Sequence, residues 1–164
     1  VVLVVSGAVA CGANFIRFSQ DDRGLKRAAA GIGQAYLISI FQQVFSRKRL
    51  QIAQVLLTKD FCSSSQEEVK KLFESYLKLG IVPVINENDV VDLNSFGGND
   101  LLAVEVATLL SVDQLLILST MAGSTYGVGG GKSKLKAIEI LRKERIQASI
   151  VDGKSQNIIL QSLL

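Results

Sequence analysis

The residues VVLVVSGAVACG, Val1 to Gly12, indicate the fold class of this protein. Val1 to Val5 is an uninterrupted apolar run, without the alternation that marks a half-exposed strand. Such a run predicts a strand buried on both faces, as in a parallel sheet that is covered by helices. Ser6 to Gly12 is made of small residues and predicts a turn directly after the strand. The segment therefore favours an α/β protein.

Strands and helices are expected to alternate along the rest of the chain. Further strands are predicted at 51–57, 81–85, 115–118 and 148–151. Helices are predicted at 23–45, broken or bent near Gly31 and Gly33, at 65–79, 100–110 and 132–144, and from Ser155 onward. Strict alternation implies right-handed βαβ crossovers and a mostly parallel sheet with helices on both sides.

A few residues predict where individual elements begin and end. Ser65 and Glu68 have the spacing of a capping box at the start of a helix. Gly80 stands where the C-cap of the same helix is expected. Pro83 lies inside the predicted strand 81–85, and a proline there favours a short strand or one that begins at the proline.

Composition excludes several classes of protein. The 164 residues fit a single domain, and no apolar run is long enough to span a membrane. Histidine is absent, which excludes Ser-His and Cys-His nucleophiles, and Cys11 and Cys62 have no metal-ligand spacing. The net charge is +3, and the basic cluster at 47–49 is interpreted as a solvated helix end rather than a nucleic-acid site. A reducing cytoplasm is the expected location.

Two segments follow predicted strands directly, where parallel sheets bind ligands. Ser6, Gly7 and Ala8 form the first, whose turn amides either bind an anion or make only a tight connection. Asn86 to Asp89 (NEND) forms the second. Its side chains either bind the ammonium and carboxylate groups of an amino acid or form a solvated turn, because Asn and Asp favour turns.

Two further segments could bind anions. In Gly97 to Asp100 (GGND), Asn99 or Asp100 is expected to cap the helix that follows, and a helix N-terminus also attracts anions. The segment GVGGGKSK, 127–134, is either a phosphate-binding loop with lysines or a flexible glycine linker. It is not a Walker A motif, because Tyr126 occupies the position of the first glycine.

The order of these segments resembles the amino acid kinase family. The resemblance extends from Val1 to about Gly153 and rests on VVLVVSGAVACG, AAAGIGQ, QVLLT, GIVPVINEND, GGND, LLIL and GVGGGKSKLKA. VPVINEND followed by GGND is its most specific part, because family members that act on acetylglutamate, aspartate or UMP differ there.

This resemblance implies a fold and a reaction. The fold is a three-layer α/β/α sandwich with a mostly parallel central sheet, and residues 1–164 would be its catalytic domain. The reaction is ATP-dependent phosphorylation of the γ-carboxylate of L-glutamate to γ-glutamyl phosphate, the first step of proline biosynthesis. ATP and Mg²⁺ are the implied cofactors, since Mg²⁺ bridges phosphates in this chemistry. No nucleic-acid or membrane partner is expected, and members of the family are usually homo-oligomers.

The resemblance also assigns roles to individual residues. The expected glutamate-binding residues are Ser6, Gly7, Asn86, Asp89 and Asn99. Lys134 is expected to stabilise the transferring phosphoryl group, and Asp100 to orient that lysine. The expected ATP-binding residues are Ser119, Thr120, Val128, Gly129, Gly130, Gly131, Lys132, Ser133 and Lys134.

The chain also departs from the family pattern. The first strand of the family, with its lysine and glycine loop, would lie before Val1. Thr120 replaces a usual aspartate, Gly131 replaces a usual methionine, and the segment between Leu118 and Gly127 is much shorter than in the family. Either the protein is degenerate or segments are omitted from the sequence, and we favour omission because 121–126 resembles two joined loop ends.

Two other functional classes compete with the kinase. A non-catalytic protein of the same fold would bind a metabolite or regulate a partner, which the missing first loop favours and the retained Asp100, Lys134 and NEND segment oppose. A P-loop nucleotide hydrolase is opposed by Tyr126 and by the position of the glycine loop late in the chain.

Overall fold

The computed structural model describes residues 1–119 and 130–163, and for Ser119, 130–133 and Leu163 it describes the backbone alone. The chain divides into two compact units, Val1–Asn99 and Asp100–Leu164. In chain order, the described elements are β1 (Leu3–Val4), α1 (Ala8–Gly12), α2 (Arg23–Ser46), β2 (Ile52–Leu57), α3 (Lys59–Ser64), α4 (Gln66–Lys78), β3 (Val82–Glu87), α5 (Asn99–Leu110), β4 (Gln114–Ser119), α6 (Gly130–Lys143), β5 (Gln147–Asp152) and α7 (Ile158–Leu163).

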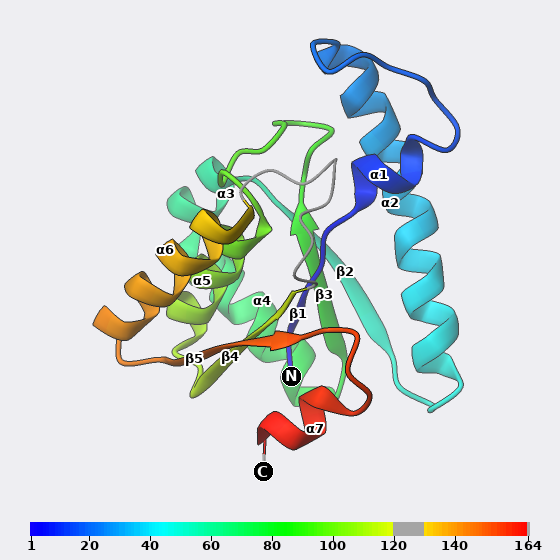
Figure 1. Cartoon of the computed structure of the whole chain (residues 1–164). Coiled ribbons are helices and arrows are strands. Elements are labelled where there is room, and N and C mark those ends of the chain that lie inside the picture. The colour runs from blue at the N-terminus through cyan, green and yellow to red at the C-terminus, as the bar shows by residue number, and fades with distance from the viewer. Residues whose placement is uncertain (120–129, 164) are drawn as a thin grey trace. The chain divides into compact units, whose positions relative to one another are not determined.

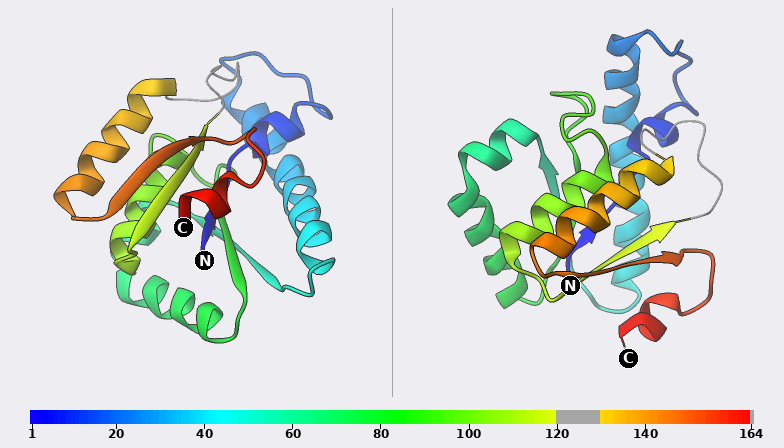
Figure 2. Two further views of the ribbon diagram at one scale, coloured as in Figure 1. Left: turned by 60° about the horizontal axis from the view of Figure 1, so that its bottom comes forward. Right: turned by 60° about the vertical axis from the view of Figure 1, so that its left-hand side comes forward.

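The first unit contains a three-stranded parallel sheet in the order β1-β3-β2. Helices α2 and α4 lie on opposite sides of this sheet (Figures 1 and 2). The central strand β3 is the buried one, and its residues from Pro83 to Glu87 are all buried. Leu3 and Val4 of β1 are only half-buried, so the predicted burial of this strand on both faces is wrong. The reason is that β1 pairs with a neighbour on one side alone within its sheet.

Pro83 is compatible with a central strand because of the register of β1. The Val82 N–H donates to the Gln51 carbonyl at 2.9 Å, on the β2 side, so the nitrogen of the next residue faces the β1 side. The β1 ladder begins only at the pair Leu3–Val84. Pro83 therefore lies just before this ladder, and its missing N–H breaks no ladder hydrogen bond.

Helices α1 and α2 contact each other backbone to backbone. A Cβ atom at Gly33 would lie 2.9 Å from the Ala8 carbonyl carbon and closer still to its oxygen. A Cβ atom at Gly12 would lie 2.8 Å from the Ala29 Cα. The small residues predicted to form a turn thus form the helix α1, because they allow this close packing. Helix α2 is continuous from Arg23 to Ser46, so Gly31 and Gly33 do not break it. The lack of a side chain at Gly33 instead allows α1 to pack against the helix.

The helix boundaries near α4 differ in part from the prediction. Ser65 makes no side-chain capping hydrogen bond, so the predicted capping box is wrong. An additional short helix, α3, precedes it, and the Thr58 hydroxyl caps α3 by accepting from the Phe61 N–H at 3.3 Å. Ser65 is the C-cap of α3 as well as the N-cap of α4. Its backbone is therefore set by the end of α3, and its side chain does not cap α4. The chain leaves α4 at Gly80, whose φ of 70° suits glycine.

The second unit contains a two-stranded parallel sheet formed by β4 and β5. Helices α5 and α6 pack on one side of these strands, and α7 lies on the other side (Figure 2). The core of this unit is apolar and is formed by Val104, Ala107, Ile117, Ala137, Leu141 and Ile146. The mixed α/β class with parallel sheets is therefore confirmed. No described helix has the length and hydropathy that crossing a membrane requires.

Candidate functional site

The first element of the site is the end of β1. The Val5 N–H donates to the Ile85 carbonyl at 2.8 Å, which brings Ser6 to the edge of the sheet where β3 also ends. Gly7 follows with φ of 107°, a conformation that L residues rarely adopt, and it precedes α1. Ser6 is exposed, so its hydroxyl is accessible to a ligand at this edge.

Asn86 lies at the end of β3 and is 1% exposed. Its side-chain nitrogen donates to Gln34 Oε1 on α2 at 2.8 Å, and its Oδ1 accepts from the Glu87 N–H at 2.9 Å. The structure extends β3 through Glu87, so both residues belong to the strand and not to the predicted loop. The amide of Asn86 is thus used in internal hydrogen bonds, and its contact with a ligand stays a prediction.

The loop between β3 and α5 is held by its own carboxylates. Glu87 is 4% exposed, and its Oε1 accepts from the Gly98 N–H at 3.2 Å. Asp89 is half-buried, and its Oδ1 accepts from the Asn94 N–H at 3.0 Å. Each hydrogen bond joins residues from the beginning of the loop to residues further along it. The second oxygen of Asp89 has no hydrogen bond among the described residues.

The electrostatic environment of this loop is strongly acidic. Burial is the largest cause that raises the pKa of Glu87 to about 7, the Asp89 and Asp92 carboxylates raise it further, and the Gly98 and Phe96 N–H groups lower it. Burial likewise raises the pKa of Asp89 above its ordinary value. Neither Glu87 nor Asp89 forms an ion pair with a described lysine or arginine. A cation bound beside them would favour their charged forms.

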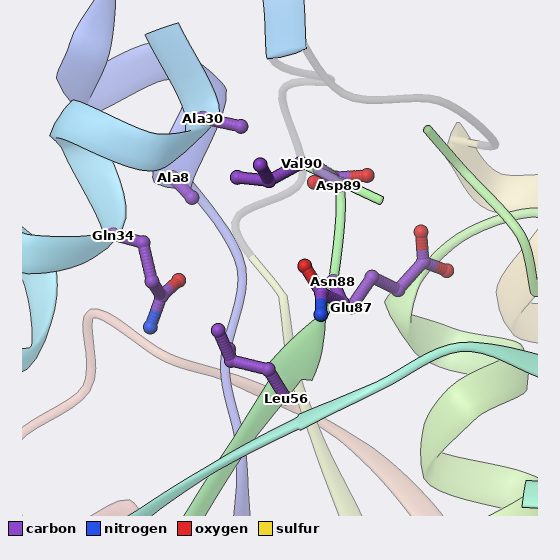
Figure 3. Close-up of a pocket in the computed structure, with 8 residues that line it drawn as sticks. All are labelled: Ala8, Ala30, Gln34, Leu56, Glu87, Asn88, Asp89 and Val90. Atoms are coloured by element: carbon purple, nitrogen blue, oxygen red, sulfur yellow. The ribbon is translucent and has the colours of Figure 1, made fainter. Parts of the chain in front are cut away.

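A small hollow lies beside these carboxylates, between α1, α2 and the end of β3 (Figure 3). Its lining consists of Ala8, Ala30, Gln34, Leu56, Glu87, Asn88, Asp89 and Val90. Its volume of about 10 Å³ is roughly what one water molecule needs. The hollow is therefore too small to enclose an amino acid unless its side chains move.

Asn99 supplies an unused hydrogen-bond acceptor at the end of the first unit. Its Oδ1 is the one buried side-chain polar atom without a hydrogen-bond partner among the described residues. Buried polar atoms are nearly always hydrogen-bonded, so an exception calls for an explanation. A ligand that carries N–H donors would supply the missing partner.

Asp100 and Lys134 form a close ion pair within the second unit. Lys134 Nζ lies 3.0 and 2.9 Å from the two carboxylate oxygens of Asp100. The Lys134 side chain is 23% exposed and that of Asp100 is 18% exposed. An ammonium group has three N–H donors, so Lys134 keeps one for a ligand. The structure thus brings together the two residues for which catalytic roles were expected.

Three of the nine residues expected to bind ATP lie outside the described structure, and for five others the backbone alone is described. Thr120, Val128 and Gly129 fall in the range 120–129, which is not described. Ser119 ends β4, and α6 begins at Gly130, two residues before the predicted start at Lys132. Ser119, Gly130, Gly131, Lys132 and Ser133 are described as backbone alone, so their roles stay predictions.

Sequence reasoning missed Gln34, and it gave Glu87 no role beyond that of the NEND segment. Gln34 shares the buried face of α2 with Ala30 and Gly33, at helical spacing, so a polar residue on a face of small residues was an available signal. For Glu87 the NEND segment indicated either ligand contact or a solvated turn, whereas the structure places this residue buried at the end of β3.

The raised pKa values predict how stability depends on pH. A carboxyl whose pKa is raised by folding holds its proton more tightly in the folded state. Its contribution to the free energy of unfolding is therefore full at low pH and is lost as pH rises to about 7. One pKa unit corresponds to about 1.4 kcal/mol. We therefore expect Glu87→Gln to raise the free energy of unfolding at pH 8 by about 2 kcal/mol and to leave it unchanged near pH 4.

Urea titrations from pH 4 to pH 8 measure this difference. Glu68→Gln, which replaces an exposed glutamate of α4, is the matched control and should follow the wild type at every pH. A Glu87→Gln profile parallel to the wild-type profile would contradict the expectation.

Comparison with known proteins shows similarity to amino acid kinases. The model of the amino acid kinase family matches residues 1–123. The chain is 36% identical to the glutamate 5-kinase of Aquifex aeolicus, with 97% of this chain and 54% of that protein covered. It is 30% and 32% identical to the glutamate 5-kinases of Streptococcus thermophilus and Enterococcus faecalis, with 99% of this chain covered in each case.

These matches also measure how much of a relative the chain represents. The chain spans about half of the Aquifex protein, and 77% and 76% of the other two. The alignment with the Streptococcus protein extends over 206 positions, which exceeds the 164 residues of this chain. The relative therefore has residues inside the matched stretch that this chain lacks, which supports the expectation of missing internal segments.

Proposed function

This chain belongs to the amino acid kinase family, and from that premise we propose that it transfers the γ-phosphoryl group of ATP to the γ-carboxylate of L-glutamate. The product would be γ-glutamyl phosphate, as in the first step of proline biosynthesis. The names of its relatives support the choice of glutamate as acceptor.

The observation that carries this proposal is the acidic loop after β3. Glu87 and Asp89 are carboxyls with raised pKa values and no cationic partner among the described side chains. Nearby, Asn99 Oδ1 is buried without a hydrogen-bond donor. An ammonium group provides a positive charge and three N–H donors. An amino acid is therefore the ligand whose α-ammonium group this loop suits.

The reaction needs little general acid or general base catalysis from the protein. A γ-carboxylate oxygen of glutamate, already deprotonated, attacks the γ-phosphorus, while the bond from that phosphorus to the bridging oxygen breaks and ADP leaves. Catalysis then rests on positioning and on neutralising charge. Lys134 is the residue we assign to the charge of the transferring group, with Asp100 holding its Nζ by two hydrogen bonds.

ATP and Mg²⁺ are part of the same proposal. Mg²⁺ is commonly held by phosphate oxygens, water and one or two carboxylates rather than by a cage of protein ligands. The described residues include no group of three or more His, Cys, Asp or Glu that could form such a cage. The metal would therefore arrive with the nucleotide and supply positive charge at its phosphates.

Acyl phosphate formation is the direct test of this function. Full-length protein is incubated with MgATP and hydroxylamine, with and without L-glutamate, and the hydroxamate is measured. Glutamate-dependent hydroxamate is the expected result. If no hydroxamate forms while calorimetry still detects glutamate binding, the second candidate function holds, a non-catalytic binding protein of this fold. The residues that this chain lacks relative to its relatives favour that second candidate.

Asp89 provides a test of the acceptor site. We expect Asp89→Ala to raise the KM for glutamate by roughly tenfold to a hundredfold and to change the KM for ATP by less than about threefold. The reason is that its free oxygen is assigned to the ammonium group. Steady-state kinetics with each substrate varied in turn measure both constants.

Two other variants separate charge from loop order. Asp89→Asn keeps an oxygen that can accept from the Asn94 N–H but loses the charge. It should therefore show most of the rise in the KM for glutamate that is expected of Asp89→Ala. Asp60→Ala removes an exposed carboxylate outside this loop and is the control. Equal increases in the KM values for glutamate and ATP would contradict the assignment.

A further inference from the structure

Glu87 connects the end of β3 to the last residues of the loop that follows, and sequence reasoning assigned it no individual role within the NEND segment. It is the last residue of β3, and its carboxylate accepts from the N–H of Gly98, eleven positions further along the chain. Gly98 is itself buried, and a buried N–H without a partner costs free energy. The Glu87 side chain thus closes the loop into a ring immediately before Asn99.

The other side-chain contacts of the loop hold its earlier part, and one backbone hydrogen bond, from the Gly97 N–H to the Asn94 carbonyl at 3.1 Å, also reaches the glycine turn. The Asn94 N–H donates to Asp89, Arg27 Nε donates to the Val90 carbonyl at 2.7 Å, and the Lys59 N–H donates to the Ser95 hydroxyl at 3.2 Å. For the last residues, Gly97 and Gly98, the conformation is unusual, with φ of 79° and 119°. Of the side-chain hydrogen bonds that the structure describes, the one from Glu87 holds this glycine turn.

The backbone of Glu87 is fixed from the opposite side. Its N–H donates to Asn86 Oδ1, and the Asn86 side chain donates in turn to Gln34 of α2. In Figure 3 the Glu87 side chain extends away from Ala8, Ala30 and Gln34. A continuous set of hydrogen bonds therefore runs from α2 through the end of β3 to the glycine turn.

From this geometry we propose that Glu87 is a positioning residue for the acceptor amino acid, which holds the Gly97–Gly98 turn so that Asp89 and Asn99 face one ligand. The inference rests on the proposed function, because the acceptor is the ligand assigned to Asp89 and Asn99. Glu87 itself acts through the turn and needs no contact with the acceptor.

The protonation state of Glu87 should tune this positioning. A carboxylate is a stronger acceptor than a neutral carboxyl group, so deprotonation strengthens the bond to Gly98. The groups that face Glu87 are the Asp89 and Asp92 carboxylates and the N–H groups of Gly98 and Phe96. With a pKa of about 7, the KM for glutamate should fall as pH rises through neutrality.

Two substitutions of Glu87 in the full-length protein test the proposal. Glu87→Ala removes the acceptor, and Glu87→Gln retains an oxygen for Gly98 and resembles the protonated carboxyl. Amide exchange at Gly98, followed by NMR, should accelerate by about tenfold or more in Glu87→Ala and remain within about threefold of wild type in Glu87→Gln. Glu68→Ala, on the exposed face of α4, is the control.

Kinetics and binding supply the functional half of the test. Glu87→Ala should raise the KM for glutamate about tenfold, with kcat and the KM for ATP changed by less than about threefold. The KM of Glu87→Gln for glutamate should equal that of the wild type at pH 6. Unlike the wild-type KM, it should not fall as pH rises through neutrality.

Three outcomes would overturn the inference. Unchanged exchange at Gly98 in Glu87→Ala would show that the side chain does not hold the turn. Faster exchange with an unchanged KM for glutamate would show that the turn does not position the acceptor. If the wild type neither phosphorylates nor binds glutamate, the proposed function fails, and exchange at Gly98 then shows separately whether the turn depends on Glu87.

Discussion

Replacing Lys134 with alanine should lower kcat for acyl phosphate formation by about a hundredfold to a thousandfold, the usual effect of removing one group that stabilises transition-state charge. The KM for glutamate should change little, because the acceptor is assigned to residues of the first unit. Folding should also be maintained, since Lys134 is partly exposed and an ion pair of this kind contributes only about 1 kcal/mol. Hydroxamate kinetics and thermal melting measure the two effects.

Matched variants make this prediction specific to Lys134. Lys136→Ala removes an exposed lysine from the same helix and should leave kcat within about twofold of wild type. Asp100→Asn keeps the shape of the partner but weakens its hold on Nζ, and it should reduce kcat less than Lys134→Ala does. Wild-type turnover in Lys134→Ala would show that the role assigned to this lysine is wrong.

The second large effect concerns the packing of α1 against α2. We expect Gly33→Ala to reduce the free energy of unfolding by about 3 kcal/mol, because its methyl group would meet backbone atoms of Ala8 that cannot turn aside. The melting temperature should fall on the order of 10 °C. The same displacement would move Ser6 and Gly7, so the remaining folded protein should also lose activity.

Gly31→Ala is the control for this experiment. It lies two residues away in the same helix, and a Cβ there would meet only the flexible end of Val90 at 3.4 Å. Alanine forms helices better than glycine by up to about 1 kcal/mol, so this variant should be as stable as wild type or more stable. Equal melting temperatures for Gly33→Ala and Gly31→Ala would contradict the packing argument.

Patterns in the sequence predicted the larger elements because each depends on local properties. The parallel strands and the long helices have apolar periods or runs that persist over several turns or residues. The sequence could not distinguish a small-residue turn from helix α1, because α1 depends on contact with α2, which lies further along the chain. The capping box at Ser65 also failed through context, since α3 ends at the same residue.

The sequence indicated which polar segments would follow the strands, but it did not indicate how their side chains would be hydrogen-bonded. The polar segments at the ends of β1 and β3 and the pairing of Asp100 with Lys134 agree with the expected arrangement within each unit. The internal hydrogen bonds of Asn86, and the bond that the Gly98 N–H donates to Glu87, depend on how side chains orient after burial. Sequence spacing does not determine that orientation, so Gln34 was given no role and Glu87 none beyond that of the NEND segment.

The direct contact between α1 and α2 has a mechanical consequence. Where side chains separate two helices, a change of rotamer lets one slide past the other, but here backbone meets backbone at Gly12 and Gly33. Because no side chain at Gly12 or Gly33 can change its rotamer, α1 and α2 should move together as one rigid body. Any displacement of Ser6 during turnover would then appear, amplified by length, at the far end of α2 near Ser46.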